Sequence, residues 1–257
     1  MCSLLTEIVV RVGQVTLSAE SWFRRLHRRG GLLPMLTDFA VEEFLLAQAA
    51  AAGLAVPTAE LQQVANRFRL RHGLSSAEAT HAWLQRQRLS GDAFEATLER
   101  DLLLEKLREH VTRDGVAGRF AERQAAYAKA RLRQILVARE DLARELLIQI
   151  RDEGADFGEL ALRHSIDPSR LDPGRIGVVV RGQLPAEVGA AVFAARAGEI
   201  VGPLATSQGF CLVLVEELQP AELDAETTAV IRAELFAEWL RGQLEEQAIT
   251  FPLLDIL

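Results

Sequence analysis

Apolar residues recur at helical spacing through most of the first half of the chain. Stripes of this kind cover residues 36–53 and 58–70, and a longer one runs through residues 92–110. Ser, Thr and Asp residues stand where several of these helices would begin, and Gly53 stands where one would end. The pattern predicts about five helices, which together form a helical N-terminal domain over residues 1–128.

A short β-branched segment precedes these helices. Residues 7–17 read EIVVRVGQVTL, and Gly13 stands at their centre, where a tight turn favours glycine. The segment predicts a short β-hairpin, followed directly by a helix that Ser18 caps.

The period of the apolar residues changes near residue 129. Alternating, β-rich runs now predict strands, and amphipathic runs between them predict helices, in the order β-α-α-β-α-β-β. This order indicates an α+β domain over residues 129–219, with a small sheet of about four strands surrounded by helices. Within it, residues 165–183 are interpreted as a long loop that is crossed by the apolar run 176–180.

The C-terminal part of the chain predicts one more helix. Residues 224–247 carry a wide apolar stripe at helical spacing, and no partner for it lies nearby in the sequence. We therefore expect residues 220–257 to return to the N-terminal helical domain and pack there. The fold class is then α+β, with the small sheet domain inserted between two helical parts. A homodimer built on the same stripe is a further hypothesis, which concerns assembly.

Composition and charge exclude several classes of protein. The 257 residues are 49% apolar and 25% charged, as in a soluble globular protein, and the formal net charge of −7 argues against nucleic-acid binding. The one basic run, residues 24–29, is either a site for an acidic partner or nucleic acid or a solvated helix face, and the net charge favours the solvated face. Two cysteines cannot form a disulfide framework, and the five histidines show no metal-ligand spacing, so we expect no metal site.

The hydropathy pattern also bears on location. No stretch approaches the ~18 uninterrupted apolar residues of a transmembrane helix. The first residues lack the basic region of a signal peptide, and Glu7 and Arg11 interrupt any apolar core. We therefore expect a cytoplasmic protein without a membrane partner.

A series of short motifs covers residues 131–217, about a third of the chain. They are, in order, RQILV at 133–137, DFGELA at 156–161, SIDPS at 165–169, GRIG at 174–177, RGQLP at 181–185, AVFA at 191–194 and GEIVGP at 198–203. In this order and at this spacing the segment resembles a parvulin-type (rotamase, PpiC) peptidyl-prolyl isomerase domain. The helical domain before it and the returning helix after it resemble the arrangement of the SurA-like and PpiC-like bacterial foldases.

The resemblance implies catalysis of rotation about the peptide bond before proline, whose barrier makes uncatalysed exchange slow. A parvulin uses an apolar pocket for the proline ring and a few hydrogen-bonding side chains, so the resemblance implies no cofactor. Active members typically hold a histidine on the first strand, another on the last strand, and a cysteine or aspartate nearby. The corresponding positions are Gln134, Cys211 and Asp167.

The resemblance also places a peptide-binding pocket, whose positions are Ile176, Val179, Leu184, Val188, Gln208 and Phe193. Several of the candidate residues have a structural interpretation as well. Asp167 suits a turn before Pro168, and Cys211 suits apolar packing in a strand. Gln134 could equally be structural, and Phe193 more often serves the core of this fold.

Two functions follow from these residues. The first is a cytoplasmic foldase or maturation chaperone that binds extended client segments, including proline-containing ones, in the pocket. By analogy of fold, it fits accessory factors such as the nitrogenase iron-protein maturation factor or the PpiC-like proteins of peptide-modification systems. The second is a catalytically silent parvulin scaffold that binds a leader peptide or a partner protein, and the replacement of both histidines favours it.

Overall fold

The chain divides into two compact units. The computed structural model describes residues 7–247, 249–252 and 254, so Cys2 lies outside the described residues. One unit comprises residues 1–113 and 234–257, and the other comprises residues 114–233. We call them the helical unit and the sheet unit. The predicted boundary at residues 128–129 lies later than the observed one at 113–114, and the predicted boundary at 219–220 lies earlier than the observed one at 233–234. Helical periodicity continues across both observed boundaries, so the sequence pattern does not mark them.

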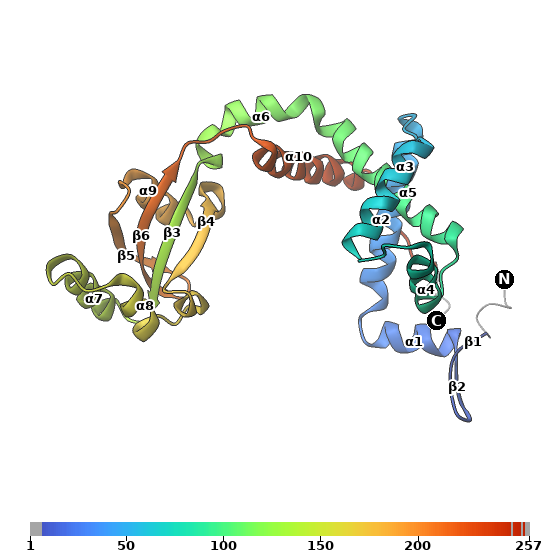
Figure 1. Cartoon of the computed structure of the whole chain (residues 1–257), viewed down its shortest axis with the longest axis horizontal. Coiled ribbons are helices and arrows are strands. Elements are labelled where there is room, and N and C mark those ends of the chain that lie inside the picture. Colours follow the sequence, from blue (N-terminus) through green and yellow to red (C-terminus); the bar gives the residue numbers. More distant parts are fainter. Residues whose placement is uncertain (1–6, 248, 253, 255–257) are drawn as a thin grey trace. The chain divides into compact units, whose positions relative to one another are not determined.

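The helical unit begins with a two-stranded antiparallel hairpin of β1 (Ile8–Val12) and β2 (Val15–Ser18). Gly13 takes a φ of +60° in the two-residue turn, a conformation that costs glycine little. The helices α1 (Ala19–Arg28), α2 (Leu32–Ala51), α3 (Thr58–Arg71), α4 (Ala77–Gln87) and α5 (Gly91–Thr112) follow (Figure 1). The hydroxyls of Ser18, Ser76 and Ser90 cap α1, α4 and α5 by accepting backbone N–H groups of the first turn.

The last helix of the chain, α10 (Ala225–Glu245), supplies part of the core of the helical unit. Phe236 is buried in one cluster with Leu45 and Ala49 of α2 and Leu107 of α5. Trp239 and Leu240 pack against the same cluster, so part of the C-terminal apolar stripe is already covered within one chain. A second cluster of Ala65, Phe94 and Leu98 joins α3 to α5.

The sheet unit is a four-stranded antiparallel sheet with helices on both faces (Figure 1). The strands lie in the order β4-β3-β6-β5, so the first and last strands of the unit form the centre. The elements along the chain are the short helix η2 (Arg113–Gly115), α6 (Val116–Arg123), η3 (Gln124–Tyr127), β3 (Lys129–Val137), α7 (Glu140–Asp152), α8 (Phe157–His164), η4 (Pro168–Leu171), β4 (Arg175–Val180), η5 (Arg181–Gln183), α9 (Ala186–Ala194), β5 (Ile200–Thr206) and β6 (Gly209–Gln219). The α+β class and the small sheet predicted from the sequence are confirmed. The apolar run 176–180, which supplies the second strand of the predicted order, is strand β4.

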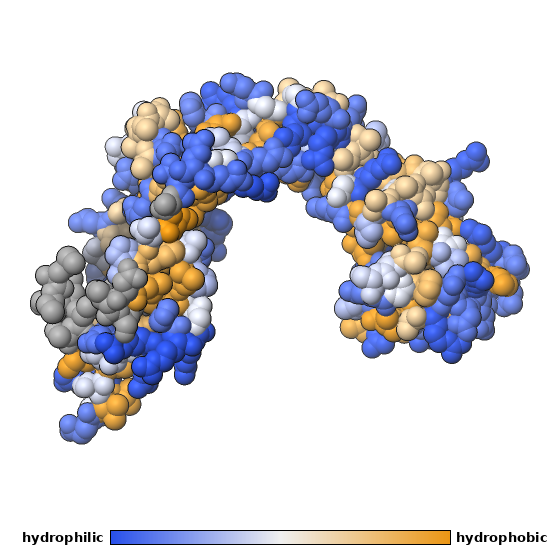
Figure 2. Space-filling model, turned by 180° about the vertical axis from the view of Figure 1, so that it is seen from behind, coloured by the Kyte–Doolittle hydropathy of each residue, from blue (hydrophilic) through white to orange (hydrophobic). Residues whose placement is uncertain are grey.

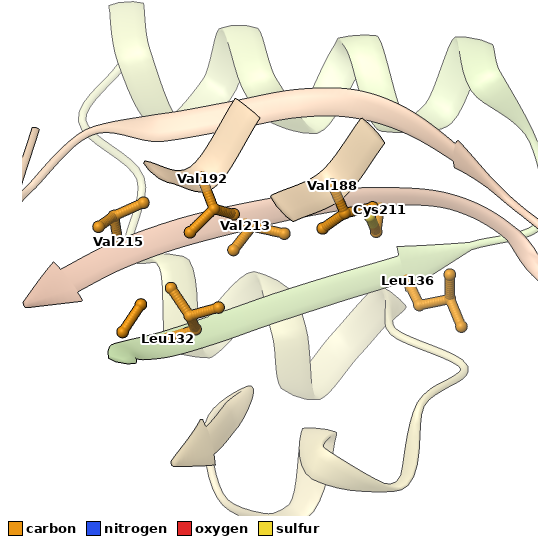
Figure 3. Close-up of a cluster of buried hydrophobic side chains, with 8 residues drawn as sticks. Leu132, Leu136, Val188, Val192, Cys211, Val213 and Val215 are labelled. Atoms are coloured by element: carbon orange, nitrogen blue, oxygen red, sulfur yellow. The ribbon is translucent and has the colours of Figure 1, made fainter. Parts of the chain in front are cut away.

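Successive residues of β3 and β6 point to opposite faces of the sheet and build two cores. On one face, Ile135 and Leu212 pack against α7 and α8, together with Ala143, Leu146, Phe157, Leu160 and Ala161. On the other face, Leu132, Leu136, Cys211 and Val213 lie under Val188 and Val192 of α9, as Figure 3 shows. Strand β6 is therefore apolar throughout residues 210–215, as a strand covered on both faces requires, whereas β3 is continuously apolar only at residues 135–137.

Candidate functional site

A small cavity opens on the α9 face of the sheet. Its volume is about 170 Å³, and it lies within the sheet unit. The residues around it come from both central strands, from the loop before η4, from β4 and α9, and from the β5–β6 turn. They are Leu132, Gln134, Leu136, Asp167, Ile176, Leu184, Pro185, Val188, Thr206, Ser207, Gln208, Cys211 and Val213.

The cavity brings together most of the residues that the sequence singled out, namely Gln134, Asp167, Ile176, Leu184, Val188, Gln208 and Cys211. Val179 lies elsewhere, because it pairs with Ala130, near the opposite end of β3 from Leu136. Phe193 also lies outside the lining: it packs against the α9 core, and the Arg181 guanidinium carbon lies 5.4 Å from the centre of its ring. Both residues are therefore packing residues of the same face and do not line the cavity.

Sequence reasoning missed six of the lining residues. Leu132 and Leu136 stand two residues on either side of Gln134, and Val213 stands two residues after Cys211. Because side chains two apart in a strand share a face, this alternation was a usable signal for all three. Pro185, Thr206 and Ser207 carry no comparable signal, since the folded loops alone bring them to the cavity.

A close backbone approach holds Gln134 at the cavity. Its N–H donates to the carbonyl oxygen of Gly174 over 2.7 Å, at the irregular step where β4 joins β3. Gly174 has a φ of +77°, and a Cβ there would lie 2.8 Å from the carbonyl oxygen of Gln134. Only glycine fits this position without displacing the strand, so the GRIG motif has a structural cause.

Buried Ser165 fixes the loop that carries Asp167 to the end of β3. Its Oγ accepts the N–H of Leu136 at 3.1 Å and the N–H of Asp167 at 3.2 Å. The N–H of Ile166 donates to the carbonyl oxygen of Leu136 over 2.8 Å. These bonds connect the loop to the strand that carries Gln134, and so they set the position of the carboxylate.

Asp167 both caps a turn and lines the cavity. Its Oδ1 accepts the N–H of Ser169 at 2.8 Å at the start of η4, which is the turn chemistry expected before a proline. Partial burial raises the pKa of this carboxyl, but hydrogen bonding from Ser169 and from the Gln134 side chain outweighs burial, so its pKa lies below the usual value. The cavity therefore holds a carboxylate at neutral pH.

Cys211 lies in the floor of the cavity and is only 4% exposed. Burial raises the pKa of its thiol, so the group is neutral at physiological pH. A neutral buried thiol behaves as a small apolar side chain, and this matches the packing interpretation of Cys211.

The opposite side of the cavity is formed by the β5–β6 turn. The Thr206 hydroxyl donates to the carbonyl oxygen of Gly209 over 2.9 Å and accepts the N–H of Gln208 at 3.3 Å. Gln208 is exposed, so its amide stands at the mouth of the cavity, facing solvent. The site thus combines an apolar floor with one carboxylate and two amides.

Comparison with known proteins identifies this unit. Residues 120–217 match the family model described as the PPIC-type PPIASE domain, Rotamase. The sheet unit contains a parvulin-type domain. It is similar to the chaperone SurA of Yersinia pestis, at 33% identity over 109 residues, and to the chaperone SurA of Escherichia coli O157:H7, at 36% identity over 91 residues.

These matches cover part of each protein. They take in 42% and 35% of this chain, and 25% and 21% of the two SurA chains, so the chain matches about a quarter of the length of these relatives. The structure of the peptidylprolyl isomerase PrsA from Bacillus anthracis covers 84% of this chain and 99% of its own, with a TM-score of 0.51 and 19% identity. At that identity the likeness concerns the fold alone.

The parvulin-type domain of this chain has a distinctive centre. Gln134 and Cys211 occupy the positions where the resemblance implies histidines, and Asp167 is retained. All five histidines of the chain are exposed, and none lines the cavity; His164 ends α8. Within the described residues, no group of three His, Cys, Asp or Glu side chains is placed to hold a metal ion. The cavity lining offers a carboxylate, two amides and apolar side chains to a bound group.

Proposed function

We propose that the chain is a foldase or maturation chaperone that binds extended, proline-containing segments of a client protein in the cavity of its parvulin-type domain. The observation that carries this proposal is the size and lining of the cavity. About 170 Å³ is below the roughly 300–1,000 Å³ of pockets for drug-sized molecules, so it suits one side chain of a longer peptide. The relatives named SurA are chaperones, which supports a client protein as the partner.

The lining also suits rotation about the bond before proline. Leu132, Leu136 and Val213 offer an apolar surface to a proline ring, and the amides of Gln134 and Gln208 offer donors to a peptide carbonyl. Moving a prolyl amide out of water removes hydrogen bonds that stabilise its planar form, and the rotation transfers no proton. The exchange of histidine for glutamine and cysteine therefore leaves the basic requirements of rotation in place.

A catalytically silent binding module is the second candidate. The absence of an imidazole from the cavity lining favours it, because the resemblance implies a histidine pair in active members. The two candidates share the binding step and differ in whether the bound prolyl bond exchanges faster.

One experiment measures both steps. NMR exchange spectroscopy on short Xaa-Pro peptides gives the cis/trans exchange rate with and without the protein, and titration of the same peptides gives their affinity. Binding with accelerated exchange supports the foldase, and binding with the uncatalysed rate supports the silent module. Absence of binding across peptides that vary the residue before proline would contradict both.

A matched pair of variants ties the result to the cavity. Leu184 is half-buried at the cavity, and Leu184→Trp should fill it and weaken peptide binding at least ten-fold. Val178 lies on β4, is 46% exposed and does not line the cavity, so Val178→Trp is the control for adding a large ring. Equal binding by the two variants would place the peptide site elsewhere on the molecule.

The cytoplasmic location and a role in peptide maturation stay predictions. Cell fractionation followed by immunoblotting tests the location, and recovery of the protein in an extracytoplasmic fraction would contradict a cytoplasmic protein.

A further inference from the structure

Positive charge is concentrated in the first three elements of the helical unit, β1, β2 and α1. Residues 8–29, which form the hairpin β1–β2 and helix α1 with its C-cap, contain five arginines and one acidic residue, Glu20. The whole chain has a net charge of −7, so the remainder is strongly acidic. We call residues 8–29 the basic segment. Its charge is opposite in sign to that of the rest of the protein.

The arginines of the basic segment are available to a partner. Arg24 pairs with Glu20 over 2.8 Å, and both side chains are 44% exposed. Arg25, Arg28 and Arg29 are exposed, and none of them forms an ion pair with the residues that the structure describes. Exposed guanidinium groups without a counter-charge among the described residues favour an anionic partner.

The hairpin adds an exposed apolar face to this charge. In its antiparallel register Val10 faces Leu17 and Val12 faces Val15, so these four side chains share one face, while Arg11 and Thr16 share the other. Val12 is 72% exposed and Val15 is 73% exposed. A two-stranded hairpin with an uncovered apolar face is marginally stable alone, so contact with an apolar phase would stabilise it.

Trp22 is an apolar residue that shares one side of α1 with arginines of the basic segment. It lies in the first turns of α1, three residues before Arg25 and seven before Arg29, so the three side chains share one side of the helix. Its side chain is 37% exposed, and the ring packs edge-on against Phe23 with 4.9 Å between ring centroids. A tryptophan beside arginines is typical of residues at the boundary between lipid and water.

Exposure of apolar residues alone would not select this segment. Both units show orange apolar residues among the blue hydrophilic ones on the face drawn in Figure 2. The basic segment differs because its apolar side chains stand next to arginines without counter-charges. Peripheral membrane binding needs both signals, since neither a short apolar surface nor a few cations hold a protein on a bilayer alone.

We propose that the basic segment docks the protein on an anionic membrane surface, with the arginines at the lipid phosphates and Trp22 and the hairpin valines in the headgroup layer. The exposed valines beside the arginines favour lipid as the anion, because a bilayer offers an apolar phase directly next to its phosphates. No helix of the described residues is long and apolar enough to cross a bilayer. The proposal revises the expectation of a protein without a membrane partner, and it does not depend on the proposed peptide site.

Co-sedimentation of the full chain with vesicles tests the proposal. We expect binding to vesicles of equimolar phosphatidylcholine and phosphatidylglycerol, and much weaker binding to phosphatidylcholine alone. The triple variant Arg25→Gln/Arg28→Gln/Arg29→Gln should lose about a hundred-fold in partition coefficient. The variant Arg86→Gln/Arg144→Gln/Arg163→Gln changes the net charge equally at exposed sites elsewhere and should bind like the wild type.

Two further variants test the apolar contact. Val12→Thr/Val15→Thr keeps the β-branched shape and should weaken binding several-fold, and Trp22→Phe should remove a blue shift of tryptophan emission on anionic vesicles. Circular dichroism confirms that each variant folds. Binding that does not depend on lipid charge would overturn the proposal, and so would an equal loss of binding in both arginine variants. It would also be overturned if tryptophan emission stayed unchanged on vesicles while the protein bound an RNA oligomer equally tightly. Self-association without vesicles that the valine variant abolishes would assign the surface to a second copy instead.

Discussion

The two faces of the four-stranded sheet are built from the same strands and differ in how completely helices cover them. On one face α7 and α8 enclose Ile135 and Leu212, both fully buried. On the other face α9 covers Leu132 and Val213 but leaves a cavity of about 170 Å³ beside Gln134 and Cys211. The open end of that face is also where the polar residues of the site gather. Both faces hold a buried core, and the proposed peptide site lies on the α9 face alone.

Truncation of a side chain on the closed face gives the largest expected effect. Leu146 of α7 is 1% exposed in the closed core, so Leu146→Ala should cost about 2–5 kcal/mol of unfolding free energy. Val188→Ala, on the cavity face, removes less volume next to a space that already exists, and should cost less. Equal losses would contradict looser packing of the cavity face, because the smaller truncation would then cost more for the volume that it removes.

The measurement has to report on the sheet unit. Trp22, Trp83 and Trp239 all belong to the helical unit, so tryptophan fluorescence follows that unit. Amide hydrogen exchange in β3 and β6, followed by mass spectrometry, gives the free energy of opening of the sheet itself.

On the open face, Ser165 should affect both the stability of the sheet unit and the binding of a peptide. Its buried Oγ accepts two backbone N–H groups, so Ser165→Ala leaves both without that partner and should cost about 1–3 kcal/mol. The same change frees the loop of Asp167, so peptide affinity should fall along with stability. Ser165→Gly serves poorly as a control because it adds backbone freedom, whereas Ser165→Thr keeps the hydroxyl and should restore part of both. Unchanged peptide binding in a destabilised Ser165→Ala protein would remove the loop from the site.

The two faces of the sheet also show how much of the fold and of the candidate site the sequence predicts. The motifs of the sheet unit sit at points of fixed geometry, such as Gly174 against the backbone of Gln134, and these motifs led to the correct fold. Most of the candidate residues meet at one cavity because strand alternation and the motif order both place them. Val179 and Phe193 do not line it, because a position within a motif does not say how far along a strand or around a helix a cavity extends.

The helical unit was less accessible to sequence reasoning. Its helices follow from apolar spacing and serine caps, but the boundary at residues 113 and 114 has no signal, since helical periodicity runs on into α6. The net charge favoured a solvated face for residues 24–29, and the arginines are indeed exposed. What composition could not supply is the exposure of Trp22 and of the hairpin valines beside them, which depends on the fold of residues 8–29.

The smallest expected effect concerns the charge at the open face. The pKa of Asp167 is lower in the folded protein than its ordinary value of about 3.9, so its carboxylate stabilises the fold fully above that value. This contribution is lost as the pH falls through the lower, folded-state pKa. Wild type should therefore exceed Asp167→Asn in stability by a constant amount above about pH 5, and the difference should shrink in more acidic solution.

The Gln134 side chain is one cause of the lowered pKa, so Gln134→Leu should raise the pKa of Asp167 and move this loss of stability to higher pH. Amide exchange of β3 in a pH series, corrected for the intrinsic exchange rate, gives the free energy of opening of the wild type, Asp167→Asn and Gln134→Leu. Parallel pH curves for the wild type and Asp167→Asn would contradict the electrostatic part of the comparison. They would show that Asp167 keeps its ordinary pKa in the folded protein, so that it is still ionised at neutral pH but the hydrogen bonds from Ser169 and Gln134 do not stabilise its charged form.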